Sequence, residues 1–168
     1  MEQNLKINIE NNQVKLAVYN FEKRLRIFHI GILVGDNEFH FGIKQGIYVC
    51  PKRNNGKKFS VLINNIIPRE MAFLRYVNIY LNNILLTTSL SFDQLLKIKY
   101  SLEKYRFGPN TYNIFYNNCI DFAYIFLCCI TTTNKELLNK NKLPIEIKQP
   151  WITEPFRLLN KHLFKYLK

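Results

Sequence analysis

The sequence lacks the features that mark secreted and membrane-spanning proteins. Residues 1–6 are polar and hold no apolar core of a secretory signal, so we expect a cytoplasmic or nuclear protein. The most apolar stretch, residues 120–130, contains Asp121 and is well short of the ~20 residues that a membrane-spanning helix needs. We therefore expect no membrane span and a reducing environment.

Cysteine and histidine are scarce, which argues against a metal centre. The chain has four cysteines (Cys50, Cys119, Cys128 and Cys129) and three histidines. It has no C-x-x-C pair, and no histidine stands at ligand spacing from two cysteines. We expect free thiols, no metal site and no cofactor.

Acidic residues are half as frequent as basic ones, 12 against 24, which gives a net charge of +12. Such a charge attracts acidic partners, including nucleic acids. The basic residues are spread along the chain without a long run or a nucleic-acid-binding motif, so we expect no nucleic-acid partner. The nucleic-acid alternative predicts binding that collapses with added salt.

Apolar and aromatic residues are abundant, with 48% hydrophobic residues, 13 Phe and 10 Tyr. That apolar volume suits one core, so residues 1–168 are predicted to form a single domain. Alternation predicts strands at 14–18 and 25–34, and a Gly-Asp-Asn turn leads back into 38–42 as a hairpin. This hairpin would bring His29 and His40 close together.

Further strands are expected at 59–63 and 76–81, and helices at 91–105, from Asn117 or Asn118 to about Cys129, and from Thr153 onwards. Ser91 and Gln94 form a capping-box pattern at the first helix. The second helix is apolar on all sides, which predicts a helix buried at the centre of the fold. The pattern favours an α+β protein.

Cys119 falls in the first turn of the second helix, where the helix dipole and unpaired N–H groups favour the thiolate. The alternative is a buried structural cysteine, which is the role we expect for Cys128 and Cys129. His29 lies in an apolar strand and His40 between two phenylalanines. Spacing alone does not choose between them as a site residue.

Several segments occur in an order that resembles a known family. They are 14–21, 28–35, 38–42 with 46–47, and 112–122, with a weaker echo at 153–156. The most specific is the block from Tyr112-Asn to Asn118-Cys119 and Phe122. Together they resemble the PPPDE superfamily and, within it, the desumoylating isopeptidases.

The resemblance implies a permuted papain-like fold of the α+β class, with a small antiparallel sheet packed against a central helix that bears the cysteine and against flanking helices. It implies Cys119 as nucleophile and selects His29, not His40, as the base. It further implies an isopeptidase that removes a ubiquitin-like modifier, SUMO or ubiquitin, from proteins. It is consistent with a homodimer, and a protein S-acyl thioesterase with the same two residues is the alternative.

Amide hydrolysis also needs donors for the oxyanion, for which we expect the Cys119 N–H and, as a candidate, the Asn118 side chain. The competing role of Asn118 is to cap the helix. Modifier tails end in Gly-Gly, so the groove should be narrow, with walls from Phe28, Phe41 and Tyr112. Each of these aromatic residues is explained equally well as part of the core.

Two departures from the family pattern stand out. Ile120 follows the cysteine where the family usually has a polar residue, which makes an inactive, modifier-binding protein a further alternative. The segment at about 50–90 is longer than the resemblance implies and is expected to border the groove. From these expectations, mild alkylation should modify Cys119 first, and replacing His40 should leave most of the activity.

Overall fold

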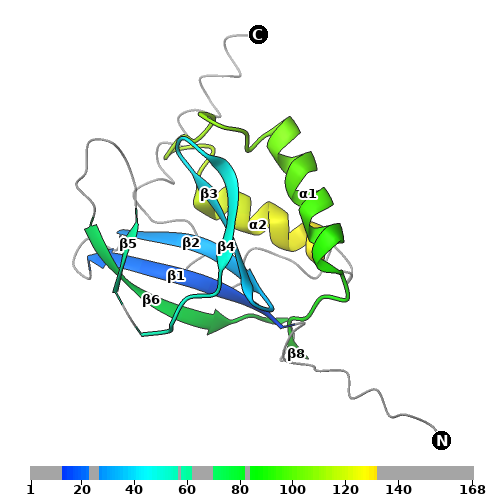
Figure 1. The fold of residues 1–168 in the computed structure, drawn as a ribbon, viewed down its shortest axis with the longest axis horizontal. Coiled ribbons are helices and arrows are strands. Elements are labelled where there is room, and N and C mark those ends of the chain that lie inside the picture. The colour runs from blue at the N-terminus through cyan, green and yellow to red at the C-terminus, as the bar shows by residue number, and fades with distance from the viewer. Residues whose placement is uncertain (1–12, 23–26, 57, 62–69, 82–83, 132–168) are drawn as a thin grey trace, which may run out of the picture.

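The computed structural model describes residues 13–22, 27–56, 58–61, 70–81 and 84–131 (Figure 1). The helix expected from Thr153 onwards lies outside the described residues. The described part combines strands and helices, and the predicted α+β class is confirmed. No helix in these ranges is both long enough and apolar enough to cross a bilayer.

Six strands form one antiparallel sheet in the order β4-β3-β2-β1-β6-β5. They are β1 (Val14–Glu22), β2 (Ile27–Val34), β3 (Asn37–Gly42), β4 (Gly46–Pro51), β5 (Lys58–Val61) and β6 (Glu70–Asn78). A separate two-stranded sheet pairs β7 (Tyr80–Leu81) with β8 (Ile84–Leu85). The predicted hairpin of β2 and β3 is confirmed, with Val34 opposite Asn37 at the turn.

Two helices cover one face of the sheet. Helix α1 (Phe92–Tyr105) begins at Ser91, where both hydrogen bonds of the predicted capping box with Gln94 are present. Helix α2 (Cys119–Ile130) begins after Asn118. As Figure 1 shows, α2 packs against β2 and β3, and α1 lies against α2 and β4.

The two faces of the sheet differ in character, because side chains alternate between the faces along a strand. Under the helices lie Val14, Leu16, Val18, Ile30, Ile32, Phe39 and Phe41, which pack with Phe122 and Phe126 of α2. The opposite face carries Tyr19, Glu38 and His40, all of them buried. Polar side chains of the central strands therefore gather on the face away from α1 and α2.

Some expectations need correction. The strand expected at 76–81 is divided, because Ile79 is buried between β6 and β7 and its carbonyl accepts a bond from the Leu86 N–H. Helix α2 is not buried on all sides: Cys129 is exposed and Cys128 is only half-buried. The expected burial of these two cysteines is thus wrong, although Cys128 still packs against the edge of the main core.

The long segment at about 50–90 supplies β5 and β6, and β6 pairs with β1 from Lys15 opposite Asn78 to Asn20 opposite Phe73. These strands extend the sheet on the side of β1, whereas α2 packs over β2 and β3. The described part of this segment therefore adds to the sheet and, as shown below, contributes Arg53 and Tyr76 to a polar network.

Candidate functional site

The start of α2 fixes the position of Cys119. Asn118 is the N-cap, and its Oδ1 accepts hydrogen bonds from the N–H groups of Ile120 at 2.9 Å and Asp121 at 3.2 Å. The Asp121 carboxylate in turn accepts from the Asn118 N–H at 3.1 Å. This reciprocal capping holds the first turn of α2, and with it the Cys119 side chain, in place.

The Asn118 side chain caps the helix and is not free to act as an oxyanion donor. Its Oδ1 is engaged with the helix N–H groups, and its Nδ2 donates to the Ile114 carbonyl at 2.9 Å. To stabilise an oxyanion, Nδ2 would have to leave the Ile114 carbonyl. The structure therefore supports the alternative that we set beside the oxyanion hypothesis.

Replacing Asn118 with alanine should lower the free energy of unfolding by about 1 kcal/mol, because the N-cap acceptor of α2 is lost. Urea denaturation followed by circular dichroism measures this. Asn118→Ser is the matched control: it keeps an oxygen acceptor and should recover most of the stability. An equal loss in both variants would mean that the bond from Nδ2 to Ile114, and not the cap, supplies the stability.

The Cys119 sulfur lies at the open edge of β2. Strand β3 pairs with β2 only as far as Gly31 opposite His40, so the Ile30 N–H has no partner in β3. That N–H is close enough to the Cys119 sulfur to lower the pKa of the thiol. Because strand N–H groups point along the plane of the sheet, the thiol lies beside the backbone of Ile30, the residue that follows His29.

The surroundings of Cys119 overturn the expected low thiol pKa. The side chain is only 5% exposed, and burial raises the pKa of the Cys119 thiol. The Ile30 N–H and the Tyr112 hydroxyl, which donates from 3.9 Å, act in the opposite direction but do not outweigh burial. Removing a thiolate from water costs more here than the donors recover, so the resting group is a neutral thiol.

The three aromatic wall candidates have different fates. Phe41 is fully buried and packs on Phe107, Tyr112 and Phe122, so it belongs to the core and does not line an open groove. Tyr112 is half-buried with its hydroxyl at Cys119, and burial raises the pKa of that hydroxyl well above its usual value. Tyr112 is therefore a permanent hydrogen-bond donor beside the thiol. The side chain of Phe28 lies outside the described residues.

His29 and His40 meet, as the hairpin predicts. Nε2 of His29 lies 3.1 Å from Nδ1 of His40. The ring centroids are 5.2 Å apart and the planes differ by 20°, so the two imidazoles are nearly parallel. Burial, followed by the charges of His40 and Arg53, lowers the pKa of His29 to about 3. The half-buried His29 is therefore neutral near pH 7.

Glu38 is a buried charged residue beside His40 that sequence reasoning missed. Its buried carboxylate accepts hydrogen bonds from the hydroxyls of Tyr19 and Tyr76, from the Arg53 N–H at 2.9 Å and from Nε2 of His40 at 3.0 Å. Burial alone would raise the pKa of Glu38, but these bonds lower it to about 2. The available signal was the alternation of Glu38 and His40 with two core phenylalanines along one strand.

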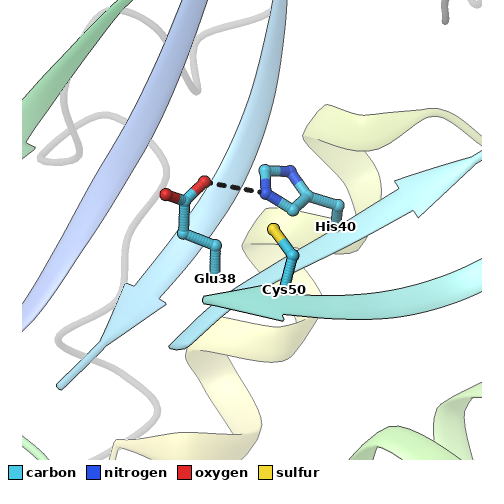
Figure 2. A group of neighbouring side chains, drawn as sticks. All are labelled: Glu38, His40 and Cys50. Atoms are coloured by element: carbon cyan, nitrogen blue, oxygen red, sulfur yellow. Dashed lines mark hydrogen bonds and ion pairs between the residues drawn. The ribbon is translucent and has the colours of Figure 1, made fainter. Parts of the chain in front are cut away.

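Figure 2 shows Cys50 of β4 beside Glu38 and His40 of β3. Cys50 is opposite Glu38 in the strand register, and one donor atom from each of the three residues lies within 4.8 Å of the others. Carboxylate, imidazole and thiolate are ligand types that zinc accepts. Both oxygens of Glu38 and both nitrogens of His40 already have hydrogen-bond partners, however, which a metal ion would have to displace. The trio is better explained as part of the hydrogen-bond network.

Ile120, the departure from the family pattern, is 4% exposed and packs in the main core. The position after the cysteine therefore serves packing here.

A scan against protein-family models gives no match for this sequence, and a search of the curated proteins gives none either.

Proposed function

We propose that the protein is a thiol-dependent hydrolase of the permuted papain-like type that removes a ubiquitin-like modifier from proteins. Cys119 is the nucleophile and His29 the general base. The observation that carries this proposal is the nearness of the Ile30 N–H to the Cys119 sulfur, where this donor lowers the pKa of the thiol. It brings the start of α2 near the strand that bears His29, and His29 precedes Cys119 in the sequence, which is the order that the resemblance implies.

The reaction begins from a neutral pair. In the structure the His29 ring lies against Tyr19 and His40, on the face of the sheet away from α2. The proposed reaction requires this ring to reach the Cys119 sulfur, so that His29 accepts the thiol proton as the sulfur attacks the carbonyl carbon of the modifier's last residue. The carbonyl oxygen becomes an oxyanion, which the Cys119 N–H stabilises, because N–H groups in the first turn of a helix have no partner within the helix. The Tyr112 hydroxyl supplies the side-chain donor in place of Asn118.

The tetrahedral intermediate then breaks its carbon–nitrogen bond, and the His29 imidazolium gives its proton to the departing lysine amine. A thioester between the modifier and Cys119 remains. His29 next takes a proton from water, whose oxygen attacks the thioester carbonyl, and the sulfur leaves and is protonated again. The modifier is released with a free carboxylate and the protein returns to its neutral pair.

The surface beside Cys119 favours a protein substrate over a small acyl group. Ile114, Phe115 and Tyr116 lie just before the N-cap and are 57%, 38% and 52% exposed. Apolar side chains gathered on a loop at a reactive thiol are typical of a surface that binds a folded partner. The net charge of +12 adds attraction for acidic modifier surfaces.

The substrate class is tested with a panel of three substrates: SUMO and ubiquitin, each joined through its C-terminus to a lysine peptide, and a peptide S-acyl thioester. We expect cleavage of at least one modifier conjugate and a loss of that activity in Cys119→Ala. Cys129→Ser, which changes an exposed thiol of the same helix, should be fully active. Cleavage of the thioester alone would favour the thioesterase alternative. Binding of a modifier without any cleavage would favour the inactive alternative.

A further inference from the structure

In the hydrogen-bond network behind His29, the donor and the acceptor of each bond can be derived from which groups carry a proton. Glu38 is ionised and buried, and a carboxylate can only accept hydrogen bonds. Nε2 of His40, 3.0 Å from Glu38, must therefore carry a proton. Burial lowers the pKa of His40 by more than the hydrogen bond and charge of Glu38 raise it, so the His40 ring is neutral and its Nδ1 is an acceptor.

The same reasoning extends to His29. Since Nδ1 of His40 accepts, Nε2 of His29 at 3.1 Å must donate. A neutral His29 protonated at Nε2 has its lone pair on Nδ1. The opposite arrangement would put the lone pair of His40 Nε2 against the Glu38 carboxylate at 3.0 Å, two acceptors in repulsion.

We propose that His40, anchored by Glu38, is a positioning residue that keeps His29 protonated at Nε2 and leaves Nδ1 as the proton-accepting atom. The proposal rests on the proposed function, because it names the basic atom of the proposed base. The nitrogen that carries the proton in a histidine is set by the hydrogen bond that its other nitrogen makes. The Glu38–His40 pair would do for His29 what an orienting carboxylate does in a catalytic triad.

The surrounding residues hold the His40 ring in the required place. Gly31 lies opposite His40, and a Cβ at Gly31 would come 2.3 Å from Cε1 and 2.4 Å from Nδ1 of that ring. On its other neighbour strand the ring stacks with Tyr48 at a centroid distance of 5.1 Å. A glycine at position 31 therefore lets the His40 ring lie over β2 and reach His29.

Two kinds of donor hold Glu38 in turn. Tyr19 comes from β1, whereas Tyr76 of β6 and the Arg53 N–H come from the long 50–90 segment. Burial, followed by the hydrogen bond to Glu38, raises the pKa of Tyr19 and of Tyr76. Both hydroxyls therefore remain donors to Glu38, and together with the Arg53 N–H they hold the carboxylate in place against His40.

Two-bond proton–nitrogen NMR spectra of the ¹⁵N-labelled protein at pH 7 test the proposal without any substrate. We expect both His29 and His40 to be protonated at Nε2, with His29→Ala used to assign the signals. In His40→Phe, which removes the acceptor and keeps an aromatic ring, His29 should become a mixture of both tautomers. A wild-type His29 protonated at Nδ1 would overturn the proposal.

Kinetics give the second readout. In His40→Phe, kcat should fall by on the order of 10²-fold with KM nearly unchanged, because the wrong tautomer affects the chemical step and not binding. His40→Gln carries both a donor and an acceptor and should recover most of kcat. A loss confined to KM, or no difference between the two variants, would contradict positioning through the hydrogen bond.

Gly31→Ala keeps every member of the network and displaces only the His40 ring. If His40→Phe does not fold, Gly31→Ala should still show the mixed tautomer of His29, and an unchanged tautomer would count against the proposal. The outcomes remain separable from the proposed function. If the His29 tautomer changes with substitution of His40 but the protein shows no hydrolase activity, the positioning role of His40 is kept and the proposed hydrolase function is rejected.

Discussion

Replacing His29 with alanine should lower kcat/KM for modifier cleavage by a factor on the order of 10²–10⁴. The reason is the protonation state of the Cys119 thiol. Burial raises the pKa of Cys119, so no standing thiolate is available and every turnover needs a base to take the proton. The dependence on His29 should therefore be stronger than in a protease whose cysteine is already ionised.

The control is His29→Gln, which retains a donor towards His40 but has no basic nitrogen. It should be as inactive as His29→Ala while unfolding at nearly the wild-type denaturant concentration. If His29→Ala kept more than about a tenth of the activity that Cys119→Ala abolishes, another group would have to take the thiol proton.

His40 needs a revised expectation. From the family pattern alone, replacing it should leave most of the activity, because the base is assigned to His29. The contact of 3.1 Å between the two rings predicts a real loss, smaller than that of His29→Ala. The identity of the base and the identity of its orienting partner are therefore separate questions, and the sequence resemblance addresses only the first.

Local patterns predicted much of the fold. The alternation along β1 and β2 and the turn before β3 gave the central hairpin, and the capping signals at Ser91 and Asn118 gave the starts of both helices. These features depend on residues that are neighbours in the sequence. For the same reason the hairpin correctly indicated that His29 and His40 would meet.

The parts that could not be predicted depend on distant residues. Tyr76 reaches Glu38 only because β6 pairs with β1 across a long sequence separation, and no local pattern indicates that pairing. The sign of the Cys119 pKa shift depends on how tightly the core closes over α2. The position of Cys119 at the start of a helix favours a thiolate. Burial of the Cys119 side chain reverses that expectation, and the sequence does not show how deeply the side chain is buried.

The same burial changes the expected alkylation pattern. A small reagent such as iodoacetamide was expected to modify Cys119 first. Cys119 is 5% exposed with a raised thiol pKa, whereas Cys129 is exposed on the outer side of α2. Small reagents should therefore reach Cys129 first. A reagent that is delivered by recognition of a modifier is needed to report on the nucleophile.

Covalent capture by a modifier probe tests the central claim most directly. SUMO and ubiquitin that carry an electrophile in place of the C-terminal carboxylate are incubated with the Cys129→Ser protein at neutral pH, and the adduct is located by peptide mass spectrometry. We predict that one probe attaches at Cys119 and at no other cysteine, and that His29→Ala reacts at least about tenfold more slowly because the thiol has lost its base. An adduct at Cys50 or Cys128, or no adduct with either probe at a folded protein, would contradict the assignment of Cys119 as the nucleophile.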